Sequence, residues 1–198
     1  MDHNEILDEL ESRPPEHVQY AGFWIRVAAS LVDFLVLSPI IVLSFYNLLG
    51  YKSLLMALLL IVAQAFYKPF MEYKYGATLG KMAVKIKVVT TGFKPISINQ
   101  TILRDGFYLL GFFASIFSTV ALYQNPDFQN MEALQGMEGF MAIGVLQTEM
   151  GPDYMSTASS FLLMVAVIVV AFDARKQGLH DKIAGTYCVY AETLKSNF

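Results

Sequence analysis

Two charged residues, Arg26 and Asp33, lie in a stretch of residues 24–46 that is otherwise nearly apolar. The stretch is long enough for a helix to cross a bilayer. A carboxylate near the middle of a membrane-spanning helix costs about 2.5 to 3.5 kcal/mol on insertion scales, so it is expected to be neutralised, hydrated or used. The residue types therefore indicate a membrane protein with a polar site at which a cation or a proton could bind.

The spacing of Arg26 and Asp33 argues against a direct pair between them. Seven residues place both side chains on one helix face, about 10.5 Å apart along the axis. Because helical side chains lean toward the N-terminus, Arg26 leans away from Asp33. Asp33 then needs a basic group, a backbone donor, water, a proton or a cation, and Pro39 predicts a bend beyond it. The alternative is a structural aspartate, hydrogen-bonded across helices that approach closely at residues 28–30.

The composition is that of a membrane protein. Of the 198 residues 55% are hydrophobic and 16% are charged, against roughly 25% charged residues in soluble domains. Four apolar stretches have about the length of a membrane span, so we predict an all-α membrane protein with four transmembrane helices at residues 24–46, 53–71, 105–123 and 157–173. We expect an acidic tail of residues 1–20 before a single membrane domain of residues 21–198. The first stretch is too long for a signal-peptide core, and we expect it to be retained.

The distribution of basic residues predicts the orientation. Lys and Arg cluster between the second and third stretches, and none occurs between Arg104 and Arg175. By the positive-inside rule both termini are expected in the cytoplasm, with residues 124–156 as an outer segment. In the inner loop, alternation over residues 84–88 and again at 96–98 predicts a hairpin, and residues 184–191 could add a third strand. We therefore expect a small cytoplasmic β-element.

Three blocks carry a family resemblance: residues 23–33 (FWIRVAASLVD), residues 76–81 (GATLGK) with 84–89 (VKIKVV), and residues 178–186 (GLHDKIAGT). In this order and spacing they resemble the RDD family of bacterial membrane proteins, named for one arginine and two aspartates. On this resemblance the three residues fall on Arg26, Asp33 and Asp181. The resemblance implies a bacterial cytoplasmic membrane and transport of ions or small ligands, with sodium/proton antiport in some members.

The loop after the second stretch contains Gly76, Thr78, Gly80 and Lys81. It is not a phosphate-binding loop of the nucleotide-binding type, because three residues instead of four separate the glycines and Met82 follows the lysine. We expect the glycines to turn the chain into the inner loop. Lys81 is then expected near lipid phosphates or near a carboxylate.

Two further pairs are expected at the cytoplasmic face. His180 could relay a proton or sense pH, since histidine titrates near neutrality. Asp181 could cap a helix or pair with Arg26, Lys81 or Arg104. Asp105 is placed to cap the start of the third span, with Arg104 as an interfacial anchor.

The outer segment is rich in methionine. Met137 and Met141 would share a helix face and could bind Cu(I). With Leu134 and Val145 they would also form the apolar stripe of an interfacial helix, and we prefer that interpretation.

Other functions leave no pattern in this sequence. It shows no nucleophile and base pair, no zinc-ligand spacing and no nucleic-acid patch. We therefore expect no enzyme, no cofactor, no metal and no nucleic-acid partner. Two hypotheses remain, an ion- or proton-coupled transporter and a non-transporting scaffold or accessory subunit, and we expect a homo-oligomer in the lipid bilayer under either.

Overall fold

The computed structural model describes residues 18–131, 136–151 and 154–194. These residues are mostly helical and form two compact units. The first unit contains residues 18–36, 68–106 and 164–194, and the second contains residues 37–67, 107–131, 136–151 and 154–163. Helices α2 (Phe23–Tyr46), α3 (Leu54–Tyr75) and α9 (Tyr154–Phe172) each contribute to both units.

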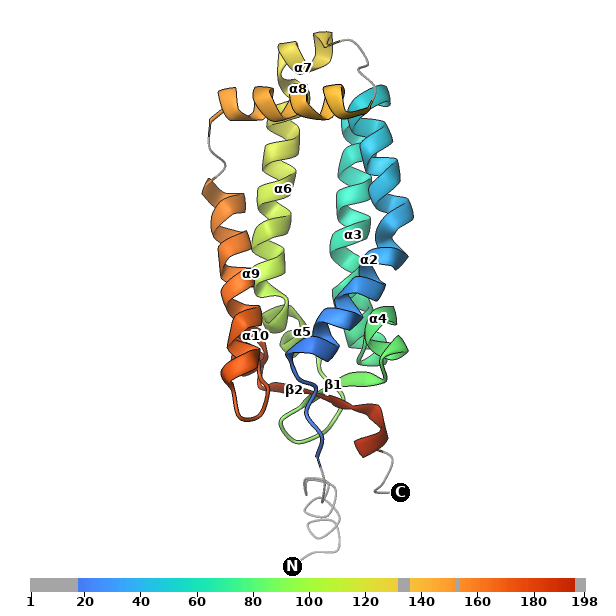
Figure 1. Cartoon of the computed structure of the whole chain (residues 1–198), viewed down its shortest axis with the longest axis vertical. Coiled ribbons are helices and arrows are strands. Elements are labelled where there is room, and N and C mark those ends of the chain that lie inside the picture. Colours follow the sequence, from blue (N-terminus) through green and yellow to red (C-terminus); the bar gives the residue numbers. More distant parts are fainter. Residues whose placement is uncertain (1–17, 132–135, 152–153, 195–198) are drawn as a thin grey trace, which may run out of the picture. The chain divides into compact units, whose positions relative to one another are not determined.

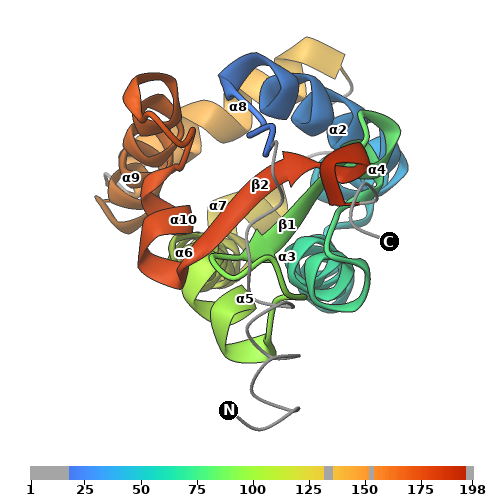
Figure 2. The same ribbon diagram turned by 90° about the horizontal axis from the view of Figure 1, so that it is seen from below.

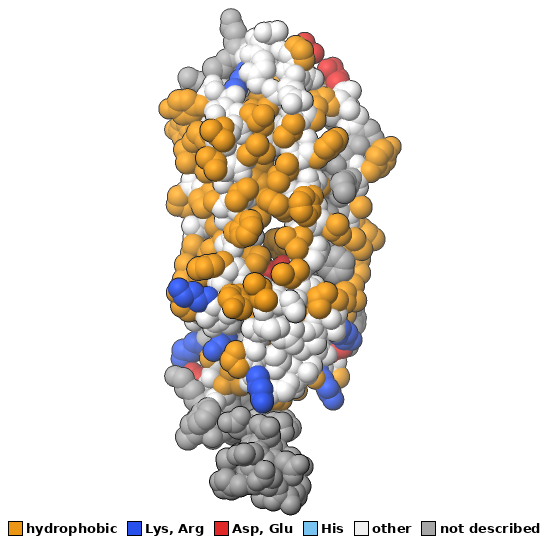
Figure 3. Space-filling view, turned by 180° about the vertical axis from the view of Figure 1, so that it is seen from behind, with side chains coloured by type: hydrophobic (Ala, Val, Ile, Leu, Met, Phe, Trp, Pro, Cys, Tyr) orange, Lys and Arg blue, Asp and Glu red, His pale blue; other side chains and the backbone are white. Residues whose placement is uncertain are grey.

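Two helices of the described chain are long and apolar enough to cross a membrane. They are α2 with the π-helical turn that extends it to Tyr51, and α3. A third span results if the broken pair α5 (Ile98–Arg104) and α6 (Gly106–Gln124) is counted as one. These two helices lie at the predicted spans 24–46 and 53–71. The count of four spans stays a prediction, although α9 is a helix at almost the predicted place. Figure 3 shows many hydrophobic side chains exposed on one face, as expected for surfaces that contact lipid.

The small sheet belongs to the first unit. Strands β1 (Ile86–Thr90) and β2 (Thr186–Tyr190) pair antiparallel, with Ile86 opposite Tyr190 and Thr90 opposite Thr186. Figure 2 shows the two strands side by side, with α5 and the short helices α4 (Leu79–Ala83) and α10 (Leu179–Ala184) near their ends. A 3-10 turn, Ala191–Leu194, follows β2. The predicted C-terminal strand is thus confirmed.

The predicted hairpin within the inner loop is wrong. Residues 96–98 form no strand, because Ser97 and Gln100 make a capping box that starts α5 at Ile98. Ile96 is nevertheless buried in the core of the first unit, beside Val88 and Cys188. The partner of β1 therefore comes from the far end of the chain instead of from the adjacent segment.

The second unit has its own apolar core. Leu122 and Tyr123 of α6 pack with Phe128 of α7 (Pro126–Asn130) and with Ile143 and Leu146 of α8 (Gly136–Glu149). Helix α8 lies across the end of α6 (Figure 1). Because α8 buries only one side, its opposite side remains apolar and exposed.

The exposed side of α8 carries the predicted apolar stripe. Met137, Met141 and Val145 are all exposed, and Leu134 lies outside the described residues. An interfacial helix would present such a side to lipid, and its placement on the outer leaflet stays a prediction.

A buried amide joins three segments of the second unit. Asn47 has no exposed surface, donates to Ser53 O and to Tyr123 Oη at 2.9 Å each, and accepts from Ser53 N at 3.0 Å. These bonds fix the turn between α2 and α3 and attach it to the end of α6. A buried polar group is stabilising only while its partners are kept.

We expect Asn47→Ala to lower the free energy of unfolding by about 2–4 kcal/mol, since the buried Tyr123 Oη and the half-buried backbone of Ser53 lose their partner. Tyr123→Phe removes one of the same hydrogen bonds and should cost about 1 kcal/mol. Denaturant unfolding of the detergent-solubilised protein measures both values. Equal losses for the two variants would contradict a central role of Asn47.

Candidate functional site

Arg26, in the first turn of α2, uses its whole guanidinium group within the first unit. Its Nη1 lies 2.6 Å from Asp181 Oδ2, its Nη2 donates to Lys176 O at 2.7 Å, and its Nε donates to Ala21 O at 3.0 Å. The predicted pairing of Arg26 with Asp181 is confirmed. Arg26 therefore ties the start of α2 to the segment that precedes α10.

Asp181 is fully buried and is shared by two arginines. It forms ion pairs with Arg26 and with Arg104, and it accepts a hydrogen bond from Gly178 N at 3.0 Å, which caps the start of α10. Burial alone would raise the pKa of Asp181, but Arg104 and Arg26 outweigh it and hold the pKa well below its usual range. The carboxylate is therefore charged throughout the physiological pH range.

Arg104 ends α5 and is buried, so its predicted role as an interfacial anchor is wrong. Besides Asp181 it contacts Thr186 Oγ1 at 2.9 Å, and its Nε lies 2.9 Å from Glu72 Oε2. One guanidinium thus bridges two buried carboxylates from different elements. Such a planar, multiply donating group suits this geometry better than an ammonium would.

Glu72 is the site residue that sequence analysis missed. It has no exposed surface and forms ion pairs with Lys81 of α4 and Arg104 of α5. The predicted second span ended at residue 71, whereas α3 continues to Tyr75 and carries Glu72 within it. The sequence contained one signal for this site, because Glu72 is a single acidic residue one turn after Lys68 at the end of an apolar stretch.

Asp105 does not cap the third span as predicted. It follows the last residue of α5, donates its backbone N–H to Thr101 O at 2.9 Å, and its Oδ1 lies 2.8 Å from Lys68 Nζ. Asp105 is buried and Lys68 is partly exposed. The pair therefore joins α5 to the last turns of α3.

The partners of Asp33 are Thr78 and Gly80, at the start of α4. Its carboxylate accepts from Thr78 Oγ1 at 2.6 Å and from Gly80 N at 2.8 Å. Thr78 also caps α4 by accepting from Lys81 N. A Cβ atom at Gly80 would overlap the backbone oxygen of Ala29, so only glycine allows α4 to approach α2 this closely.

The remaining predicted residues are close to these groups. Gly76 ends α3 with φ +72°, a conformation that favours glycine. His180 Nε2 lies 3.5 Å from Asp181 Oδ1. Burial and the nearby Arg104 lower the pKa of His180 to about 3, against the opposing effect of Asp181. His180 is therefore neutral at physiological pH.

We call the eight charged residues that make these contacts the charge network. Ion pairs link five of them in one series from Arg26 to Lys81, Lys68 and Asp105 form a separate pair, and Asp33 contacts Thr78 and Gly80. The charge network contains four cations and four carboxylates, and all of them belong to the first unit: Arg26, Lys68, Lys81, Arg104, Asp33, Glu72, Asp105 and Asp181. The network is electrically balanced. Within the described ranges, no group of three or more His, Cys, Asp and Glu side chains is placed to hold a metal ion.

The family model of the RDD family matches residues 20–185, a range that contains the whole charge network. The chain belongs to the RDD family. The resemblance of the three sequence blocks is thereby confirmed, and with it an integral membrane protein. Comparison with curated proteins and with solved structures yielded no match. The arginine and the two aspartates of this RDD protein are thus parts of one network, in which Arg26 contacts Asp181 and Asp33 contacts the α4 loop.

We expect Gly80→Ala to destabilise the protein by about 1–3 kcal/mol, the usual cost of forcing extra volume into a packed site. The added methyl group would push α4 from α2 and weaken the bonds to Asp33. Gly92→Ala is the matched control, since its nearest neighbour is a side-chain atom at 3.8 Å. Thermal unfolding in detergent compares the two variants, and equal midpoints would refute the close approach at Gly80.

His180 makes stability depend on pH in a defined direction. Its pKa of about 3 in the folded protein lies below the ordinary 6.5, so the unfolded chain takes up a proton first as the pH falls. Stability should be complete above pH 6.5 and lower by on the order of 2 kcal/mol at pH 5.

The measurement is the unfolding free energy in detergent between pH 7 and 5, a range above the titration of Asp181. His180→Gln should flatten the curve over this range. An unchanged slope in His180→Gln would show that another group is responsible.

Proposed function

We propose that this RDD protein couples to a cation or a proton and carries it across the bacterial cytoplasmic membrane by way of the charge network. The burial of Glu72 and its two ion pairs support this proposal. Glu72 is fully buried and lies between Lys81 of α4 and Arg104 of α5. A proton or a cation arriving at this carboxylate competes with two cationic side chains from two different elements.

Stability alone is a poor explanation for the charge network. Buried ion pairs gain little over apolar side chains of similar volume, because desolvation offsets most of their attraction. Ionisable groups at membrane depth are costly and mark functional sites in many membrane proteins. In a chain with 16% charged residues, the gathering of eight in one unit supports a functional role.

The contacts suggest how occupancy could change the conformation. Lys81 attaches α4 to α3 through Glu72, while the neighbouring Gly80 attaches the same helix to α2 through Asp33. Neutralising Glu72 would remove the first attachment and leave the second. The link between α2 and α3 would then depend on whether Glu72 holds a proton or a cation.

This proposal moves the centre of the site away from Asp33. The sequence pointed to Asp33 as a deep carboxylate in need of a partner, and its two hydrogen bonds supply that partner. Asp33 then acts as a positioning residue that holds the start of α4. Glu72 is the carboxylate that binds and releases the proton or cation.

A scaffold or an accessory subunit of a membrane complex is the second candidate function. It is favoured by the complete pairing of the carboxylates Asp33, Glu72 and Asp181, which a purely structural lock would also show. Under either function we propose a homo-oligomer, since the four predicted spans are few for a monomeric transporter.

We expect the purified protein in liposomes with an internal pH-sensitive dye to respond to an imposed sodium, potassium or proton gradient. Glu72→Gln should reduce this flux at least about tenfold, the effect expected for loss of an essential proton-transfer group. Glu149→Gln is the matched control, because the same chemical change falls on an exposed glutamate at the end of α8, outside the charge network.

Protein abundance and unfolding midpoint are measured for each variant in the same preparation. Flux lost at normal abundance supports coupling, whereas abundance and flux that fall together support the scaffold. Wild-type vesicles that behave like empty vesicles under every gradient would overturn transport of these ions.

A further inference from the structure

A pocket of about 320 Å³ lies where α3 ends, between α4, β1 and the turn after β2. Tyr75 and Met82 line it together with two lysines, Lys85 and Lys87, and one acidic residue, Glu192. All of these residues belong to the first unit and none belongs to the charge network. The pocket thus combines an apolar wall with an excess of positive charge.

Lys87 lines the pocket, and its aliphatic stem is packed against the backbone. The stem crosses Gly76, where a Cβ atom would lie 2.6 Å from Lys87 Cε and 3.2 Å from Cγ. Glycine at this position therefore serves both the left-handed turn and the path of the lysine. Among the described residues, none forms a hydrogen bond or an ion pair with the Lys87 ammonium group.

Lys85 is a second cation that is only weakly engaged. Its Nζ lies 3.0 Å from Glu192 Oε1, and both side chains are 72% exposed. Exposed pairs of this kind contribute little free energy. A stronger anion can therefore draw Lys85 away from Glu192 at small cost.

The position of the pocket favours a lipid as the source of that anion. α3 is long and apolar enough to span the membrane, and it ends at Tyr75 in the pocket wall. Tyrosines and lysines at the end of a span lie at the level of the lipid headgroups. Exposed Met82 of α4, which lines the pocket with both lysines, offers apolar surface there.

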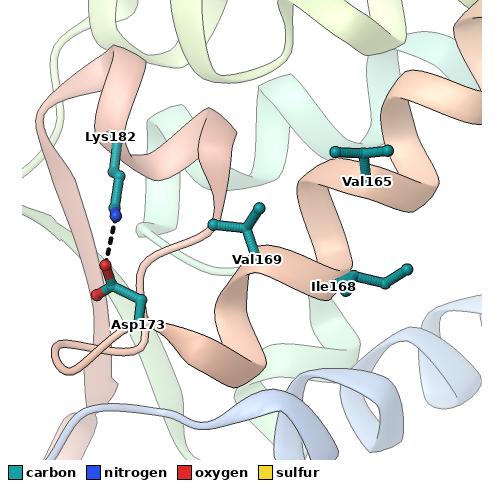
Figure 4. A pocket seen from close by; sticks show the side chains of 5 residues that line it. All are labelled: Val165, Ile168, Val169, Asp173 and Lys182. Atoms are coloured by element: carbon teal, nitrogen blue, oxygen red, sulfur yellow. Dashed lines mark ion pairs between the residues drawn. The ribbon is translucent and has the colours of Figure 1, made fainter.

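A pocket on α9 shows why Lys87 matters. That pocket, of about 280 Å³, is lined by Val165, Ile168 and Val169, and its lysine, Lys182, forms an ion pair with Asp173 (Figure 4). Its positive charge is already matched by a neighbouring carboxylate. The pocket at the end of α3 differs by holding a cation beyond the number of its carboxylates.

We propose that the pocket at the end of α3 binds a phosphate group, supplied by an anionic phospholipid of the cytoplasmic leaflet. Lys87 and Lys85 contact the phosphate oxygens, and the lipid tails follow the apolar surface of α4. Glu192 weakens the site by competing for Lys85. A phosphate from a soluble molecule has the same chemistry, and the test separates the two sources.

The test is a titration of the full-length protein in neutral detergent with phosphatidylglycerol, followed by native mass spectrometry of bound lipid. Phosphatidylglycerol should bind more tightly than zwitterionic phosphatidylcholine. Lys87→Gln should weaken phosphatidylglycerol binding about fivefold, the factor that one lysine contributes near an anionic lipid surface. Glu192→Gln should strengthen it, because Lys85 loses its competing carboxylate.

Lys94→Gln is the matched control, since this exposed lysine lies outside the pocket. Equal effects of Lys87→Gln and Lys94→Gln, or weaker binding in Glu192→Gln, would overturn the site. Inorganic phosphate is added as a competitor in a second arm. Displacement of the lipid by millimolar phosphate would overturn the lipid as the source, and resistance to it supports the lipid.

Discussion

Two guanidinium groups hold the Asp181 carboxylate, and the order of the first unit depends on this shared contact. Arg26 comes from the first turn of α2 and Arg104 from the last turn of α5, while Asp181 caps α10. The partners are 155 and 77 residues away along the chain. Removal of one partner of a buried pair typically costs about 3–5 kcal/mol, because the other charge stays buried without compensation. The carboxylate therefore connects α2, α5 and α10, which are far apart in the sequence.

The same principle extends from Asp181 through Arg104 to Glu72. Arg104 contacts both carboxylates, so a change at Glu72 alters the charge that Asp181 experiences. In a medium of low dielectric such neighbours influence one another strongly. In the function proposed above, a proton or cation that reaches Glu72 would displace one of the cations of the charge network, and this displacement would couple binding to movement.

Backbone geometry sets the positions of the charges as much as the charges themselves do. Gly80 lets α4 approach α2 closely enough for its amide to reach Asp33, and Gly76 ends α3 so that Lys87 can cross it. In both contacts the absence of a side chain on the glycine leaves the space that its neighbour occupies. Two glycines in one short loop thus connect the charge network on one side with the proposed phosphate site on the other.

The sequence by itself determined the membrane class, the positions of the first two long apolar helices and the need of Asp181 for a partner, with Arg26 among the candidates. The length of an apolar stretch must match the thickness of the bilayer, so spans can be recognised from hydropathy. A charged side chain within a span is costly, so a group that compensates it is expected. The capping box at Ser97 was also present in the sequence and could have placed the start of α5. A capping box depends only on residues that are neighbours in the sequence, and the cost of a charge in the membrane is the same in every fold, so both can be recognised from the sequence.

Only the tertiary structure decided the partners of Glu72 and Asp105, the loop that Asp33 holds, and the pairing of β1 with β2. The two strands are about a hundred residues apart, and a local hairpin pattern competes with such a pairing in any analysis of short segments. Each carboxylate could pair with several lysines or arginines of similar chemistry. The choice depends on which of them the folded chain brings within a few ångströms, and that is a property of the packing as a whole.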